Sequence, residues 1–449
     1  MSQLRPLNPI QLAFHYLGDL TNPNSGELLT FGGHLDVDQL RRAIELALAC
    51  HPLLNAAVVS RAGRPHWQLA EEPLPVDLRI NRTRRSKPET VLQALCDNLW
   101  REPLPKNGRQ VRFIYTQGPK KSYLQICAPH SVTDAWSGTR LAADIGQAYT
   151  ALINGQTWSG VVRQPLERPL KDVFLHRHSI RQRLGLMFEA ARRLLRDVVE
   201  PGMGLDLDAA KITKPTAVSV TRVPNRILTQ SLKQARHHGV TAHSLFLVAL
   251  TRARRELLNG RGHLPFRVND FATLRPFADR DVEKVFDVLV VPNQLTIDPT
   301  WDDDLALRVL SGRLKKQKTG AILPELYRLG LYGSLARVMP VKLTAGMVFK
   351  LINKTDLAVT NPGKVPWQSE LERFGDVEVE DFINFPHLLP PAKAVVIFTT
   401  FRDELRIIHL HDPATTPEGL EKALIQPFIR HLDELNQKLV RTNQMLSSD

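Results

Sequence analysis

The chain has 449 residues, of which 43% are hydrophobic and 23% charged, and its formal net charge is +13. These proportions are typical of a globular protein, and the length predicts two or three domains, each large enough to bury a core. No uncharged apolar run approaches the roughly 18 residues of a membrane span, and the first residues lack the basic and apolar regions of a signal peptide.

The cysteines and the charge narrow the class of protein further. Cys50, Cys96 and Cys127 are widely spaced and form no Cys-x-x-Cys pair, which predicts reduced thiols, a cytoplasmic location and no metal site. The positive charge attracts anionic partners. No helix-turn-helix, zinc-finger or aromatic RNA-binding signature is present, so we do not expect nucleic acid among those partners.

The first part of the chain mixes predicted strands and helices. In chain order we expect a strand around Leu29–His34, a helix from Val37 to Ala49 capped by aspartate, a turn and strand in "HPLLNAAVV", a hairpin around "QGPKK", and a helix from about Ala135 to Leu152 that ends at Asn154-Gly155.

A basic helical segment follows at residues 171–202. Six arginines and one acid lie between Arg177 and Arg196, and Pro201-Gly202 ends the helix. Its apolar residues recur at helical spacing: Val173, Ile180, Leu184, Met187, Phe188, Ala191, Leu194, Leu195 and Val198. Such a stripe usually packs on its own protein while the arginines face solvent, which is the arrangement we expect here. Contact with a membrane surface is the alternative.

A second mixed unit begins near Thr216. Its sequence predicts a strand, a helix, a turn at Gly239 and a long buried helix. Strands are then expected in "FRVNDFATLRPF", "VFDVLVVPNQLTID", "DLAVTNPGKV" and "AVVIFTTFRDELRIIHLHDP", and a final helix in "EGLEKALIQPFIRHLDELNQKL". The basic stretch "SGRLKKQKTG" is expected to be a loop. We therefore predict an α/β fold with an N-terminal unit at residues 1–165, a basic connector at 166–215 and a C-terminal unit at 216–449.

The stretch "YLQICAPHSVTDAWSG" holds the candidate catalytic residue, His130. The spacing His-x-x-x-Asp occurs at His15, His34 and His130, so the spacing alone carries almost no information. Only His130 follows a long apolar strand, and Pro129 ends the pairing of that strand. A histidine where a strand leaves the sheet can present a ring nitrogen to a cleft as a general base. Asp134 either orients this histidine or pairs with a distant cation such as Arg275.

The motif "PHSVTDAWSG" resembles the His-His-x-x-x-Asp-Gly motif of the chloramphenicol-acetyltransferase-like superfamily. That superfamily includes the condensation domains of nonribosomal peptide synthetases and the polyketide-associated and wax-ester acyltransferases. "LNPIQLAFHYL", "HPLLN", "HHGVTAHSLFLVALTRA", "ATLRPF", "VVPNQLTID" and "AVTNPGKV" resemble other segments of the family in the same order, so that the similarity covers nearly the whole chain.

The resemblance implies two related subdomains in a V-shaped pseudo-dimer with a central tunnel. It implies an acyltransferase of natural-product biosynthesis in which His130 is the general base and Asp134 pairs with Arg275 in a structural role. The donor would be a phosphopantetheine thioester on an acyl or peptidyl carrier protein or on CoA, and the acceptor a small alcohol or amine, with no bound cofactor. Residues matching the motifs are candidates for the tunnel wall: Pro129, Ala135, Trp136, Ser137, Gly138, Asn293, Thr360 and Asn361.

Two departures from the family motif keep an alternative open. Pro129 replaces its first histidine, and Ala135 replaces its glycine. A non-catalytic protein that binds acyl chains or carrier proteins on the same scaffold is the second hypothesis, and a peripheral membrane protein is the third. We expect a free-standing monomer. The pair His237-His238 is expected at the surface, and "HLHDP" is expected to be a structural strand rather than a metal site.

Overall fold

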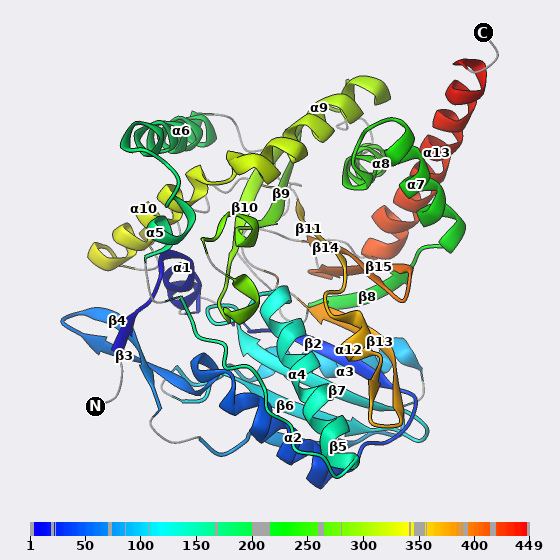
Figure 1. The fold of residues 1–449 in the computed structure, drawn as a ribbon. Coiled ribbons are helices and arrows are strands. Elements are labelled where there is room, and N and C mark those ends of the chain that lie inside the picture. Colours follow the sequence, from blue (N-terminus) through cyan, green and yellow to red (C-terminus); the bar gives the residue numbers. More distant parts are fainter. Residues whose placement is uncertain are drawn as a thin grey trace.

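The computed structural model describes residues 4–18, 22, 24–70, 74–85, 87–106, 108–166, 169–199, 216–258, 265–279, 281–340, 343–344, 355, 357–385, 388, 394–413 and 419–446. In this part of the chain, two six-stranded sheets dominate the fold, and each carries helices on its faces (Figure 1). A bilayer-spanning helix is not found among these residues, because none is both long and apolar enough.

The first sheet has the strand order β12-β13-β2-β7-β6-β5. Its strands are β12 (Arg373–Phe374), β13 (Val377–Phe385), β2 (Asn24–Phe31), β7 (Ser122–Pro129), β6 (Arg112–Gln117) and β5 (Leu78–Arg82). The helices of this half are α1 (Pro9–Leu17), α2 (Val37–Ala49), α3 (Pro88–Arg101) and α4 (Ala135–Ile153). Apolar faces of α2 and α4 pack with the strands around Phe31, Phe113 and Tyr115, and this packing forms the core of the first half.

A small sheet and the second large sheet complete the strands. The small sheet pairs β1 (Leu4–Pro6), β4 (Arg64–Leu69) and β3 (Ala56–Arg61). The second large sheet has the order β10-β9-β11-β14-β15-β8, formed by β10 (Val290–Ile297), β9 (Phe266–Thr273), β11 (Leu357–Lys364), β14 (Ala394–Phe401), β15 (Glu404–His411) and β8 (Ala217–Arg222). Its helices are α7 (Asn225–His237), α8 (Ala242–Leu257), α9 (Asp303–Lys316), α10 (Pro324–Val338) and α13 (Gln426–Leu446), whereas the short α12 (Gln368–Leu371) packs on α4 of the first half.

Most elements predicted from the sequence are present where they were expected. Helix α2 spans Val37–Ala49, and the side chain of Asp36 caps it by accepting a hydrogen bond of 2.8 Å from the backbone N–H of Gln39. The β6–β7 hairpin forms around the "QGPKK" turn. Gly155 and Gly239 follow helices with positive φ, which glycine adopts without steric cost.

One segment crosses between the halves in a way that the sequence does not predict. Strand β13 lies 377 residues into the chain, yet it pairs antiparallel with β2 of the first sheet. A shared apolar cluster also joins the halves, with Leu28 and Cys127 from the first and Val395 and Ile408 from the second. The expected boundaries near residues 165 and 215 stay a prediction, but β12 and β13 belong structurally to the first sheet.

Two expectations for basic segments are wrong. The stretch "SGRLKKQKTG" is not a loop: it forms the end of α9 and a wide helical turn at Gln317–Ala321. The connector forms α5 (Leu170–Phe174) and α6 (Ile180–Val199), but most of the apolar stripe does not pack on the protein. Among the described side chains of α6, only Ala190 and Asp197 are buried.

Candidate functional site

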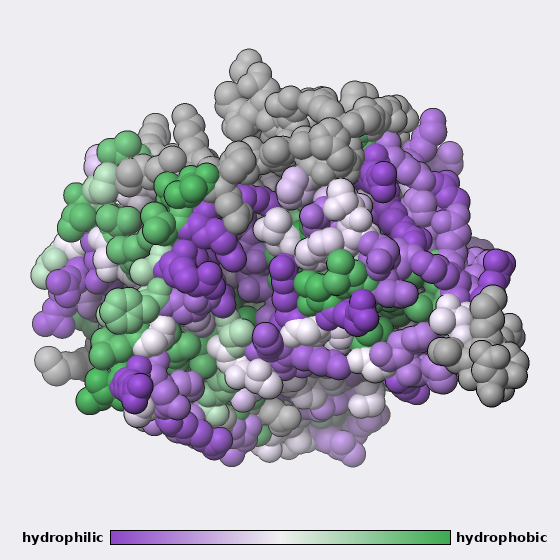
Figure 2. Space-filling view, turned by 90° about the horizontal axis from the view of Figure 1, so that it is seen from above, coloured by the Kyte–Doolittle hydropathy of each residue, from purple (hydrophilic) through white to green (hydrophobic). Residues whose placement is uncertain are grey.

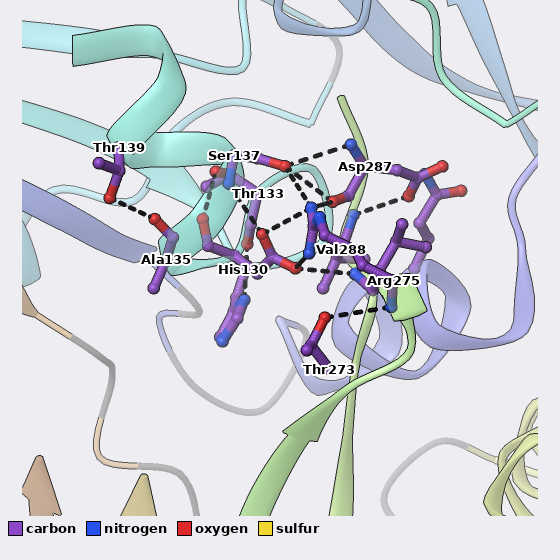
Figure 3. Close-up of polar contacts among 12 residues, drawn as sticks. His130, Thr133, Ala135, Ser137, Thr139, Thr273, Arg275, Asp287 and Val288 are labelled. Atoms are coloured by element: carbon purple, nitrogen blue, oxygen red, sulfur yellow. Dashed lines mark hydrogen bonds and ion pairs between the residues drawn. The ribbon is translucent and has the colours of Figure 1, made fainter. Parts of the chain in front are cut away.

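His130 stands where the sequence predicts it, directly after β7. Its Nδ1 lies 2.7 Å from the carbonyl oxygen of Thr133. A carbonyl oxygen can only accept a hydrogen bond, so Nδ1 carries the proton and Nε2 keeps its lone pair. No described residue forms a hydrogen bond with Nε2. Figure 3 shows the ring extending away from Ser137 and Asp287, with its contact to Thr133 drawn as a dashed line.

The surroundings of His130 favour the neutral ring. The imidazole stacks on the ring of Phe14 from α1, with ring centroids 4.3 Å apart and an interplanar angle of 22°. Burial lowers the pKa of His130 below its usual value of 6.5, although the hydrogen bond to Thr133 opposes the shift. The residue is therefore a neutral base with an available nitrogen at neutral pH.

Asp134 takes the second of the two roles that the sequence left open. Its carboxylate accepts hydrogen bonds from both terminal nitrogens of Arg275, at 2.6 and 3.1 Å, whereas the His130 ring is hydrogen-bonded to the carbonyl of Thr133. It also caps α4 by accepting from the N–H of Ser137 at 2.9 Å, and it accepts from the N–H of Leu289 at 2.9 Å. Although burial opposes ionisation, Arg275 and these N–H groups hold the pKa of Asp134 below its usual range.

Arg275 connects the two halves of the molecule. It begins the short helical turn after β9, while Asp134 begins α4 of the first half. Its Nη2 also donates to the hydroxyl of Ser137 at 2.9 Å and to the carbonyl of Asp287 at 3.1 Å (Figure 3). The loop that carries His130 is thus fixed to the second half by a buried ion pair.

Asp287 is a buried acid of this cluster that the sequence reasoning missed. Its carboxyl oxygens accept from the side-chain amides of Asn8 and Gln11, at 3.1 and 2.9 Å, and from the N–H of Leu166 at 3.2 Å. Burial raises the pKa of Asp287 to about 7, with a further contribution from Asp134. The only signal in the sequence is a lone acid inside the apolar run "VFDVLVV".

The residues that follow the motif aspartate have structural reasons for their identity. Ala135 is the first residue of α4 and does not have positive φ, so the missing glycine leaves no backbone strain there. Trp136 packs edge-on against Trp367, with centroids 4.7 Å apart. A Cβ at Gly138 would lie 1.7 Å from Oε1 of Glu27, so any larger residue would collide with that carboxyl group.

Glu27 is a second buried acid that the sequence reasoning missed. It lies on β2, opposite Ile126 of β7, and it is 4% exposed. Burial raises the pKa of Glu27 to about 8, although a hydrogen bond with Asn384 of β13 opposes the shift. At neutral pH the carboxyl group is therefore mainly protonated and can donate a hydrogen bond beside the first turn of α4.

The remaining candidates lie on the second sheet and form a separate group. Asn361 is 3.2 Å from Nδ1 of His243, whose Nε2 is 2.9 Å from Asp270. Asn293 lies directly opposite Asp270 on the neighbouring strand. Thr360 is paired within the sheet through its backbone. In the described structure, no hydrogen bond connects this group with His130.

The other histidines that the sequence singled out have no catalytic arrangement. His237 is exposed and His238 half-buried, as expected for a surface pair. His409 is buried on β15, and its Nε2 lies 3.2 Å from the hydroxyl of Thr221. Across the described ranges, no three His, Cys, Asp or Glu side chains are grouped closely enough to hold a metal ion.

Comparison with known proteins gives one sequence relative and many structural ones. No family model matches the chain. An alignment over 151 residues, which covers 32% of the chain, shows 28% identity to the probable non-canonical nonribosomal peptide synthetase CymA of Salinispora arenicola (strain CNS-205). The match covers only 2% of that much longer protein.

The solved structures match over nearly the full length of the chain. The first condensation domain of the CDA synthetase has a TM-score of 0.69 and 15% identity, over 97% of this chain and 96% of that one. The epimerization domain from the third module of tyrocidine synthetase B has a TM-score of 0.69 and 15% identity, over 98% of each chain. Polyketide synthase associated protein 5 from Mycobacterium tuberculosis has a TM-score of 0.66 and 12% identity, over 97% of this chain and 100% of that one.

These matches confirm the fold that the motifs predicted, and at such low identity they show the fold alone. In this chain the Asp134–Arg275 ion pair joins the two halves beside the loop of His130. The arrangement of the halves matches that of the solved structures. The chain has the fold of the condensation domains of nonribosomal peptide synthetases and of the related polyketide-associated proteins.

Proposed function

We propose that this protein is a condensation-type acyltransferase that transfers an acyl group from a pantetheine thioester to an amine or an alcohol, with His130 as general base. The observation that carries the proposal is the state of the His130 ring. Thr133 holds the proton on Nδ1, and Nε2 has no hydrogen-bond partner among the described residues. Burial keeps the pKa of the ring low, so the base is neutral at neutral pH.

In the proposed reaction, the acceptor nitrogen or oxygen attacks the thioester carbonyl carbon while Nε2 of His130 takes the acceptor's proton. The carbon–sulfur bond then breaks, and the thiolate leaves with the proton that His130 returns. No acyl-enzyme forms, because the histidine handles only the proton. The donor would be presented by a carrier protein or by CoA, both of which carry phosphopantetheine.

Asp134 and Arg275 would act on this reaction as positioning residues. The carboxylate of Asp134 is held by four donors, and the Thr133 carbonyl that orients His130 belongs to the adjacent peptide. Fixing Asp134 therefore fixes the carbonyl that sets the tautomer of His130. A general base held in one orientation typically contributes about 10²–10⁴-fold to the rate.

The test is a donor and acceptor screen with the full chain. Acyl thioesters of pantetheine, CoA and a carrier protein are each mixed with amines and alcohols, and free thiol and product mass are measured. We expect product with at least one pair and loss of product with His130→Ala, while the exposed control His237→Ala leaves the rate unchanged. Donor binding without transfer across the whole screen would instead favour the non-catalytic alternative.

A further inference from the structure

Helix α6 is attached to the protein mainly by charged side chains, together with the buried Ala190 and with Leu186, which packs against an apolar core cluster. The carboxylate of Asp197, which is 1% exposed, accepts a hydrogen bond of 2.7 Å from Arg328 of α10. Arg193 donates to Glu325 at 3.1 Å and to the carbonyl of Ala321 at 2.9 Å. These contacts occupy the face of α6 that lies against α10.

The opposite face of α6 is apolar and faces solvent. Ile180 is 79% exposed, Phe188 70%, Leu195 66% and Val199 73%. Leu184, Met187 and Val198 of the apolar stripe are partly exposed on the same side, so that the stripe from Ile180 onward and Val199 form one exposed face with the three- and four-residue spacing of a helix. Figure 2 looks down on this side of the molecule, and apolar side chains gather toward its left, where α6 and α10 lie. An amphipathic helix that points its apolar face outward needs an external apolar surface to cover it.

Cations border the apolar stripe. Arg181 and Arg192 lie beside it on the helix wheel and are exposed, and Arg177 is exposed just before the helix. The basic end of α9 lies nearby, because the charge of Arg196 lowers the pKa of Arg313 in addition to the effect of burial. Lys316 and Lys318 at that end are exposed as well. The surface therefore combines an apolar ridge with positive charge along its edge.

We propose that α6 docks the protein onto the surface of a membrane that contains anionic lipids. The helix has 20 residues and is therefore about 30 Å long. A helix with an apolar stripe and arginines beside it lies in the plane of the lipid interface, with its apolar side chains among the acyl chains and its cations at the phosphates. A second copy of this chain is disfavoured as the occupant, because two chains of net charge +13 repel each other.

Vesicle flotation with the full chain tests the proposal. One set of vesicles contains phosphatidylcholine alone, and the other contains phosphatidylcholine with phosphatidylglycerol. We expect binding to the anionic vesicles that decreases with added salt, and much weaker binding to the neutral ones. The double variant Phe188→Ser with Leu195→Ser should reduce binding at least about tenfold, because two large apolar groups no longer insert.

A second pair of variants separates charge from hydrophobicity. Arg181→Gln with Arg192→Gln should weaken binding to anionic vesicles by about fivefold per arginine and leave the weak binding to neutral vesicles unchanged. The matched control is Leu232→Ser with Arg236→Gln on α7, which changes the same residue types at an exposed site away from α6. All these side chains are exposed, and the ion pair of Arg192 with Glu189 that one variant removes is a surface pair that contributes little to stability, so the melting temperatures should stay close to the wild-type value.

Three results would overturn the proposal. The first is no binding of the wild-type chain to anionic vesicles at low salt. The second is equal loss of binding in the α7 control. The third is that the chain does not bind vesicles but forms a stable dimer, or a complex with an acidic carrier protein, and that Phe188→Ser dissociates this dimer or complex. The proposal does not depend on acyl transfer, so a failed activity screen would leave it standing.

Discussion

The carboxylate of Asp134 and the guanidinium of Arg275 form two hydrogen bonds, at 2.6 and 3.1 Å, although 141 residues separate them in the chain. Both groups are buried, so neither can exchange its partner for water. The pair joins the first turn of α4 to the end of β9 and hence one half of the molecule to the other.

Removing either partner of this pair should destabilise the protein strongly. Asp134→Ala and Arg275→Ala should each lower the free energy of unfolding by about 3–5 kcal/mol, because each leaves a buried charge without its partner. The double variant should lose less than the sum of the two. Urea unfolding measures all three. The exposed pair of Arg226 and Asp433, with contacts of 3.0 Å, is the control, and its loss should cost at most about 1 kcal/mol. Small, additive losses at Asp134 and Arg275 would contradict this expectation.

Replacing the proposed base should remove activity without affecting the fold. His130→Ala should lower the rate of acyl transfer by about 10²–10⁴-fold and leave thioester binding intact. Single-turnover kinetics and a binding titration with the same donor separate the two effects. Near wild-type turnover would mean that another group takes the proton.

The acid limb of the pH profile should report the environment of His130. Protonation of Nε2 removes the base, so kcat/KM should decrease at acidic pH with an apparent pKa below 6.5 and should be flat around neutrality. Burial is the main cause of this low pKa, and Phe14 covers one face of the ring. Phe14→Ala should therefore raise the apparent pKa toward 6.5, whereas Phe14→Leu should shift it less. An unchanged limb in both variants would show that it belongs to a different group.

Stability should depend on pH through Glu27. The folded protein keeps a proton on this carboxyl group up to about pH 8, whereas the unfolded chain loses it near its ordinary value of 4.5. The folded state therefore binds more protons between these values, and the free energy of unfolding should decrease as the pH rises through that window. Glu27→Gln should reduce the slope by up to about 1.4 kcal/mol per pH unit. Glu45→Gln on the exposed face of α2 is the control. Identical slopes for wild type and Glu27→Gln would show that Glu27 is ionised.

The salt dependence of the donor KM should show whether a carrier protein presents the thioester. If a carrier protein presents the thioester, its acidic surface is attracted by the basic end of α9, where Lys316 and Lys318 are exposed. Electrostatic screening shortens from about 10 Å at 0.1 M salt to about 3 Å at 1 M, so the donor KM should rise steeply with salt. The same acyl group on pantetheine should be nearly insensitive, and Lys316→Gln with Lys318→Gln should flatten the response to the carrier protein. Equal salt responses of the two donors would exclude this docking.

The local parts of the site could be predicted from the sequence, and the non-local parts only by resemblance. Caps, strand ends and helix periodicity depend on neighbouring residues, which is why α2 and the position of His130 were predicted well. The residues alone offer Arg275 as one candidate cation and leave the role of Asp134 open, and the family resemblance then implies that the two form a pair. Phe14 lies in a family-like segment that gives no sign of its contact with His130, Glu27 and Asp287 lie in no motif that was singled out, and only the folded chain brings the three close to the α4 end of the site.

For helix α6 the sequence predicts the local structure correctly and the packing wrongly. Its periodicity correctly predicts a helix, but periodicity cannot tell which face points inward. We expected the apolar stripe of α6 to pack on the protein, whereas buried ion pairs with Arg328 and Glu325 turn the charged face inward. A partner for Asp197 more than 100 residues away is invisible to any local pattern.

The position of β13 has a consequence for how this protein can be divided and synthesised. Because β13 fills the edge beside β2, a fragment that stops before residue 377 would leave β2 as an open, apolar edge strand. Such edges recruit other chains, so the fragment should aggregate rather than fold as half a molecule. On the ribosome, the first sheet must likewise wait for more than 370 residues before its last partner emerges. The two halves therefore exchange a segment of chain. A chimera that swaps the first half with that of another protein has to include residues 373–385 in the swapped part.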